Sequence, residues 1–303
     1  MTPPNLLDPA TINQAEALGM AARYIVEGYL AGEHKSPFRG FSVEFTQHRE
    51  YVPGDDLRHL DWKVLGRTDR YYLKQYEQET NFVCHILLDG SESMNFGGVR
   101  GHGSGISKLD YGKLMAACLS YLVLHQRDAV SLMLFDEQVR QFVPRTGNLG
   151  SIHNIIRLLS EHRGAHRTRI ADALHQLAGQ TSRRGIVVLI SDLFDDEQEI
   201  LHGIQHLRFI GHEVIVFHVL DRFELEFPFK GNVEFDGLEI DQKLLTRPAE
   251  IRKSYQRELQ AFCDSIRAGC ERNRCDYVLV NTATPLQETI GGYLAFRHRT
   301  NLR

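Results

Sequence analysis

From residue 81 onward, apolar runs alternate with helix-like segments, and this alternation constrains the fold most strongly. The runs expected to form strands cover residues 82–89, 129–135, 185–191, 212–220 and 276–282, with a weaker, edge-like run at 139–144. Helical spacing of apolar residues covers 108–126, 149–161, 170–180, 196–210 and 248–273. Near-continuous apolar strands between helices predict an α/β fold with a doubly wound, mostly parallel sheet flanked by helices. Such sheets bind ligands at the carboxyl ends of their strands, near the point where the strand order reverses.

One of these runs, in the segment ILLDGSESM (residues 86–94), ends in a row of oxygen-bearing side chains. Asp89, Ser91 and Ser93 stand at positions i, i+2 and i+4, which puts all three on one side of an extended segment. A turn alone needs only a residue such as Gly or Asn. The row therefore indicates part of a site for a hard cation or a phosphate.

Other strand ends supply further oxygens. The run 185–191 leads directly into Asp192, and Thr168 lies in the loop just before the helix expected at 170–180. A divalent cation takes about six oxygen ligands, so these two residues are candidates to complete the set. A structural alternative remains for each: Thr168 can cap that helix, and Asp192 can serve as a cap or turn residue.

The first 80 residues have a different character. Apolar residues at three- and four-residue spacing predict a helix over 11–30, and residues 41–45 and 71–79 are expected to be strands of a small sheet. The predicted organisation is an N-terminal helix plus a β-rich module at 1–80, followed by the α/β domain at 81–303.

Composition narrows the class of protein. Lys plus Arg number 35 and Asp plus Glu number 39, a net charge of −4 that does not favour nucleic acid as a partner. The five cysteines form no C-x-x-C pair, which fits reduced thiols in a cytoplasmic chain. No apolar run approaches 18 residues and the N-terminus lacks the pattern of a signal peptide, so we expect no membrane insertion.

The D-x-S-x-S row, a loop threonine and a strand-terminal aspartate together resemble the metal-ion-dependent adhesion site of von Willebrand factor A domains. The resemblance implies a divalent ion, Mg²⁺ or alternatively Mn²⁺ or Ca²⁺. It implies as ligands Asp89, Ser91, Ser93, Thr168 and Asp192. In that family one coordination position stays open, and a partner protein fills it with a Glu or Asp carboxylate.

Residues 32–79 resemble the signature of the DUF58 family, whose members carry an A-type domain and are typically associated with MoxR-type AAA+ ATPases. The residues that carry this match are Tyr51, Pro53, Gly54, Asp55, Asp56, Arg58, Asp61, Trp62 and Lys63. The resemblance implies an interaction module whose partner is such an ATPase, a client protein, or both. The glycine-rich loop at 94–108 is long, so we expect the rim of the site to have its own shape.

Enzymatic alternatives find less support. A dehalogenase-type phosphatase needs a second Asp at the position that Ser91 occupies, and no Walker A motif is present. Asp55 or Asp56 together with Asp61, Trp62 and Lys63 only faintly resembles a nuclease arrangement of two acids and a lysine. His202 and His206 are expected to be solvated residues on a helix face. A metal-dependent hydrolase that uses the same acids stays open as the second hypothesis. Whether the 32–79 module is structural or a docking surface for the ATPase also stays open.

Overall fold

The computed structural model describes residues 18–20, 22, 44–50, 64, 66, 71–77, 83–97, 105–181, 184–236 and 243–300. It divides into two compact units, one of Met1–Pro37 with Val83–Arg303 and one of Phe38–Phe82. The predicted boundary after residue 80 lies close to the second break, although residues 1–37 group with the larger unit. Most of the predicted helix at 11–30 and most of the DUF58 signature lie outside the described residues.

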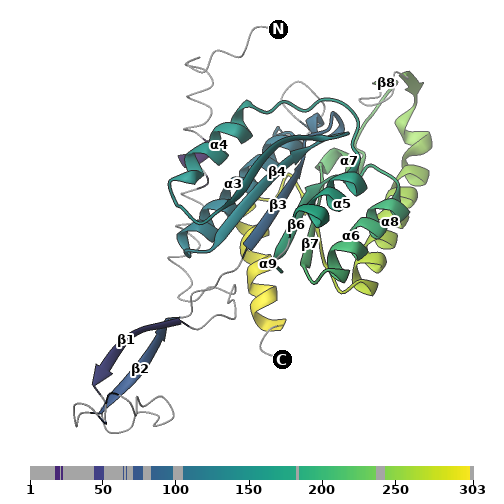
Figure 1. Cartoon of the computed structure of the whole chain (residues 1–303). Coiled ribbons are helices and arrows are strands. Elements are labelled where there is room, and N and C mark those ends of the chain that lie inside the picture. Colours follow the sequence, from purple (N-terminus) through teal and green to yellow (C-terminus); the bar gives the residue numbers. More distant parts are fainter. Residues whose placement is uncertain are drawn as a thin grey trace. The chain divides into compact units, whose positions relative to one another are not determined.

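A six-stranded sheet forms the centre of the larger unit (Figure 1). In spatial order its strands are β10 (Asp276–Asn281), β7 (Glu213–Leu220), β6 (Ile186–Ser191), β3 (Val83–Asp89), β4 (Ala129–Phe135) and β5 (Val139–Thr146). All pairings are parallel except that of β4 with β5, which is antiparallel at the edge of the sheet. The doubly wound, mostly parallel α/β fold expected from the sequence is thereby confirmed, including the edge position of β5.

Helices cover both faces of this sheet. One face carries α5 (Ile170–Gln180), α6 (Glu197–Phe209) and α8 (Pro248–Arg272). The other carries α3 (Lys108–His125), α4 (Ser151–Glu161) and α9 (Leu286–Thr300) (Figure 1). Every residue of β3, β4 and β6 is buried, which explains why these strands are continuous apolar runs in the sequence.

Alternate residues of β3 pack against opposite layers. Leu87 belongs to the core cluster beneath α5, α6 and α8. Leu88 faces Gly112 of α3, where a Cβ would lie 2.8 Å from the Leu88 Cδ1 atom. The close approach of helix and strand on this side therefore depends on a glycine.

Some short elements carry too little periodic pattern to be expected from the sequence. They are α7 (Arg222–Glu226), β8 (Val233–Asp236) and β9 (Lys243–Thr246). The helix α9 is longer, but it was not predicted from the sequence either. In the smaller unit, β1 (Glu44–Glu50) pairs antiparallel with β2 (Tyr72–Glu77). The sequence predicts a strand at 41–45, whereas β1 runs from Glu44 to Glu50 and consists mostly of the polar sequence TQHRE, which a search for apolar runs misses. No helix among the described residues is both long and apolar enough to cross a bilayer.

Candidate metal centre

The strand order reverses between β3 and β6, and the candidate site lies there. The chain leaves β3 for its neighbour β4 on one side, whereas it leaves β6 for β7 on the other. Asp89 is the last residue of β3, and Asp192 directly follows β6. The carboxyl ends of these two strands therefore bring the two carboxylates to the crevice where such sheets bind ligands.

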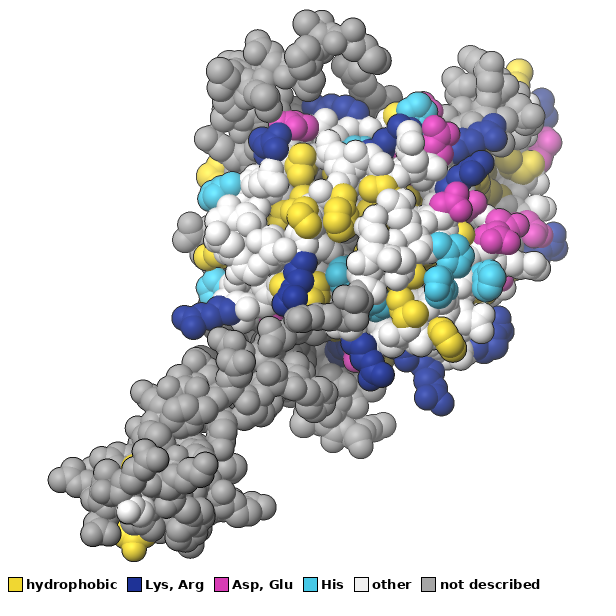
Figure 2. All heavy atoms as spheres, viewed as in Figure 1, with side chains coloured by type: hydrophobic (Ala, Val, Ile, Leu, Met, Phe, Trp, Pro, Cys, Tyr) yellow, Lys and Arg dark blue, Asp and Glu magenta, His cyan; other side chains and the backbone are white. Residues whose placement is uncertain are grey.

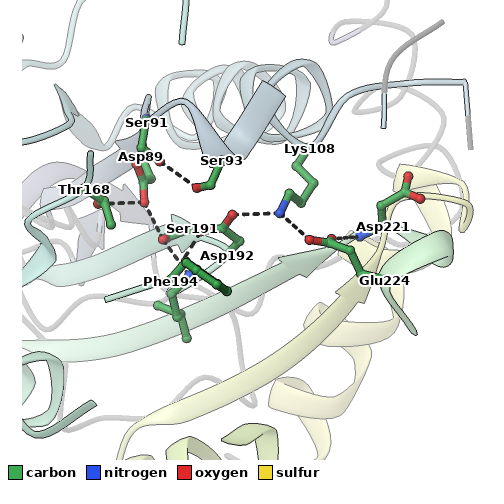
Figure 3. A network of polar contacts seen from close by, with 11 residues as sticks. Asp89, Ser91, Ser93, Lys108, Thr168, Ser191, Asp192, Phe194, Asp221 and Glu224 are labelled. Atoms are coloured by element: carbon green, nitrogen blue, oxygen red, sulfur yellow. Dashed lines mark hydrogen bonds and ion pairs between the residues drawn. The ribbon is translucent and has the colours of Figure 1, made fainter. Parts of the chain in front are cut away.

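The structure gathers the predicted residues into one buried polar network (Figure 3). The backbone N–H of Ser91 donates to Asp89 Oδ1 at 2.9 Å, and the Ser91 and Ser93 hydroxyl oxygens are 3.1 Å apart. Thr168 donates from Oγ1 to Asp89 Oδ2 at 3.0 Å. All five residues are at most 8% exposed, Asp192 among them.

The loop that carries Thr168 is held by backbone hydrogen bonds to the neighbouring loops. Ala165 N donates to Gly90 O at 3.1 Å, and Arg169 N donates to Asp136 O at 3.0 Å. Arg169, rather than Thr168, is the N-cap residue of α5, and its side chain makes no capping bond. The capping alternative for Thr168 is therefore wrong, because its hydroxyl is directed to Asp89.

Gly90 separates two of the candidate ligands, Asp89 and Ser91, and leaves no space for a side chain. A Cβ at this position would lie 1.9 Å from Nε2 of the buried His162. The backbone N–H of Gly90 donates to Phe135 O at 2.7 Å, which ties the loop to the end of β4. The glycine in D-G-S-E-S is thus required by packing.

Asp192 has two sets of contacts. Its Oδ1 accepts a hydrogen bond from Phe194 N at 3.3 Å. This contact is typical of a turn residue, the structural alternative given above for Asp192. Its Oδ2 accepts from Nζ of Lys108 at 2.7 Å. Asp196, not Asp192, caps α6, since its side chain accepts from the N–H groups of Gln198 and Glu199.

Sequence reasoning missed three residues of this network, namely Ser191, Lys108 and Glu224. The Ser191 hydroxyl donates to Asp89 Oδ2 at 2.6 Å, and Lys108 also donates to Glu224 Oε1 at 2.8 Å. Ser191 stands next to Asp192 at the end of a strand, a signal that could have found it. Lys108 and Glu224 have no such signal, because their proximity depends on the tertiary fold.

The two aspartates experience opposite electrostatic environments. Burial and the nearby charge of Asp192 raise the pKa of Asp89 to about 7, although hydrogen bonds from Ser191 and Ser91 oppose that shift. Burial would also raise the pKa of Asp192, but the Lys108 ammonium outweighs it and holds the pKa below its ordinary value. A hydrogen bond with Ser93 acts in the same direction.

The donor set fits a hard divalent ion. It consists of two carboxylates and three hydroxyls and contains no sulfur or imidazole, which favours Mg²⁺, Mn²⁺ or Ca²⁺ over zinc. Burial and, after it, repulsion from Asp192 both disfavour the charged form of Asp89, and a bound cation would offset both effects. In the described part of the chain, no cluster of three or more His, Cys, Asp or Glu side chains is arranged to hold a metal.

The histidines on α5 and α6 form a separate group, and histidine side chains gather on this face of the molecule in Figure 2. His202 and His206 are exposed, as expected from the sequence. His175 Nδ1 lies 2.8 Å from His206 Nδ1, and the His175 and His202 rings are 5.8 Å apart.

Comparison with known proteins identifies the family. The family described as "Protein of unknown function DUF58" matches residues 47–262. This chain belongs to the DUF58 family. It is 27% identical over 248 residues to Uncharacterized protein Rv1480 of Mycobacterium tuberculosis, an alignment that covers 78% of this chain and 75% of that protein.

Solved structures of low sequence identity also match. One is the conserved hypothetical protein BatB from Bacteroides thetaiotaomicron, with 16% identity, a TM-score of 0.43, and coverage of 72% of this chain and 99% of that one. Another is the SpRpn10 VWA domain, with 14% identity, a TM-score of 0.38, and coverage of 68% and 91%. The predicted DUF58 membership is confirmed by the family match, and that family and this α/β fold suggest a protein-interaction module.

Proposed function

We propose that this protein is a non-enzymatic interaction module that binds partners through a divalent ion, most simply Mg²⁺. The observation that carries the proposal is the convergence of Asp89, Ser91, Ser93, Thr168 and Asp192 at the switch point of the sheet. The ion would be held by the carboxylates and hydroxyls, and it would supply a Lewis-acidic position that accepts a partner's Glu or Asp. We further propose a cytoplasmic adaptor role in which a MoxR-type AAA+ ATPase supplies the chemical work on a client protein.

Exposed residues beside the buried network offer a surface for the partner. Phe194, two residues after Asp192, is 69% exposed, and Glu92 between the two serines is also exposed. An exposed phenylalanine beside a polar site is the kind of apolar contact that protein interfaces use. The partner's carboxylate would then reach the ion while adjacent apolar groups pack on Phe194.

A metal-dependent hydrolase is the second candidate function. The observation in its favour is the pKa of about 7 at Asp89, a value suited to a general base at neutral pH. Against it, both oxygens of that carboxylate already accept hydrogen bonds, from Ser91 N, Thr168 and Ser191. Metal-dependent turnover of p-nitrophenyl phosphate or ATP that disappears in Asp89→Asn would favour the hydrolase.

Capture of a MoxR-type AAA+ ATPase from the same organism tests the proposal. We expect wild-type protein to retain the ATPase in Mg²⁺ and to release it in EDTA, and we expect Asp89→Ala to abolish capture. Thr168→Ala should weaken capture more than it weakens ion binding, because a neutral hydroxyl holds the ion less strongly than a carboxylate. Thr181→Ala is the matched control, since that hydroxyl bonds Leu177 O and His212 instead.

Capture that ignores EDTA and both site substitutions would place the interface elsewhere. The module at residues 32–79 would then be the leading candidate, and charge reversal at Arg58 would test it.

A further inference from the structure

Lys108 is a buried cation at the edge of the candidate ion site. It is the first residue of α3, its side chain is 2% exposed, and its ammonium lies 2.7 Å from Asp192 Oδ2. The second acid that it contacts, Glu224, is 20% exposed and 2.8 Å away. Burial favours the neutral amine, but the two carboxylates outweigh that cost and raise the pKa of Lys108.

Glu224 is itself held in place by the fold. Its Oε2 accepts from the backbone N–H of Asp221 at 2.7 Å, which completes a capping box at the start of α7. Asp221 in turn accepts from Thr282 Oγ1 at 2.8 Å, after the end of β10. A continuous series of contacts therefore runs from Asp192 through Lys108 and Glu224 to Asp221 (Figure 3). The hydrogen bond from Thr282 extends it to the end of β10.

These contacts have a consequence for ion binding. One oxygen of Asp192 accepts a hydrogen bond from the Lys108 ammonium, so the charge of this candidate ligand is already partly neutralised. A positive charge so close to the site repels a divalent ion, and in a buried environment that repulsion is weakly screened. Glu224 works in the opposite direction, because its carboxylate compensates part of the lysine charge.

We propose that Lys108 and Glu224 are positioning residues that set the affinity of the site for its divalent ion. Lys108 fixes Asp192 and lowers the affinity, whereas Glu224 restores part of it. The arrangement makes ion binding weak enough to be coupled to a partner, whose carboxylate adds the missing negative charge. This inference rests on the proposed metal-dependent function.

Substitutions at the two positions should shift ion affinity in opposite directions. Mn²⁺ titration, followed by the electron paramagnetic resonance signal of the free ion, gives the Kd. We expect Lys108→Met to lower the Kd by about tenfold or more, since even one unit charge a few ångströms away interacts strongly at an effective protein dielectric. Glu224→Gln should raise the Kd by about threefold or more, because the lysine charge is then less compensated.

Lys113→Met is the matched control. Lys113 is another buried lysine of α3, but it donates to Asp110 Oδ1 and to His162 O instead of to the site carboxylates. The Kd of the Lys113→Met variant for Mn²⁺ should stay within about twofold of the wild-type value. If Lys108 has only a structural role, both lysine variants should be less stable than wild type, and their Kd values for Mn²⁺ should not differ.

The outcomes separate the inference from the function on which it rests. If Lys108→Met does not fold, Glu224→Gln still tests the account, because its amide can keep the bond to Asp221 N. Unchanged Kd in Glu224→Gln, or in a folded Lys108→Met, with ion binding intact in wild type, would overturn the inference alone. Absence of ion binding in wild type would overturn the proposed function itself.

Discussion

The two ends of the central sheet both bury polar side chains, but the carboxyl ends bring two buried carboxylates close to each other, whereas the polar contacts at the amino ends described below join neutral groups. At the amino ends, His85 Nδ1 lies 2.7 Å from Ser131 Oγ, and His212 Nε2 lies 2.9 Å from Thr181 Oγ1. Burial lowers the pKa of both histidines and so favours their neutral forms. At the carboxyl ends, Asp89 and Asp192 lie close enough for the charge of one to raise the pKa of the other.

The difference shows what distinguishes a candidate site from a polar part of the core. Neutral hydrogen-bonded groups satisfy one another and specify packing. Two buried carboxylates that repel each other are costly, and a fold retains such groups where a ligand or a cation uses them. The following predictions test whether the two ends differ in this way.

The largest expected effect concerns acid stability and the amino-end cluster. Burial first, then the charges of His212 and Arg145, lower the pKa of His85 to about 4, below the value near 6.5 of an unfolded chain. The unfolded state therefore takes up a proton first, and the stability contributed by neutral His85 is lost as pH falls from 6.5 to 4. Over that window the loss is about 3 kcal/mol.

Urea unfolding at a series of pH values measures this contribution. His85→Gln cannot titrate, so its free energy of unfolding should fall less steeply between pH 6.5 and 4.5 than that of wild type. His153→Gln, at an exposed position of α4, should keep the wild-type slope. Identical slopes in all three proteins would show that the buried histidine is not held neutral.

A smaller effect is expected when a glycine at each end of the sheet is replaced by alanine. At Gly185, before β6, a Cβ would lie 2.4 Å from the Val83 carbonyl oxygen, and at Gly90 it would meet the His162 ring. Each alanine substitution should cost about 2 kcal/mol through overpacking. Only Gly90→Ala should also weaken ion binding, because it displaces the loop between Asp89 and Ser91.

Thermal melting with Mg²⁺ and with EDTA checks both parts of that prediction. Gly179→Ala, in α5 with nothing within 4 Å of the new Cβ, is a control that should not lose stability. Equal loss of the Mg²⁺-dependent shift in Gly185→Ala and Gly90→Ala would mean that the carboxyl-end loop has no special role.

Much of the central sheet could be predicted from the sequence, because the burial of a strand leaves a pattern in consecutive residues. Strands such as Ala129–Phe135 are buried on both faces and are therefore continuous apolar runs. The candidate ligands were predictable for a similar reason, since parallel strands bring their carboxyl ends to one edge.

The rest could not be predicted because it depends on tertiary distance. Lys108 and Glu224 are 116 positions apart and meet only after α3 and α7 pack at the same edge. In addition, the sequence does not distinguish a buried lysine at the start of a helix from an exposed one. The short elements near residues 222–246 have no periodicity long enough to detect.

The most direct test of the central claim is a titration of the intact chain with Mn²⁺, in which the free-ion resonance reports binding. We expect each chain to bind one Mn²⁺ ion, which excess Mg²⁺ displaces. Binding should be lost in Asp89→Ala and kept in His85→Gln, because only the first change removes a charged ligand. A wild-type protein that leaves the free-ion signal unchanged, or an Asp89→Ala variant that binds with wild-type stoichiometry and affinity, would contradict it.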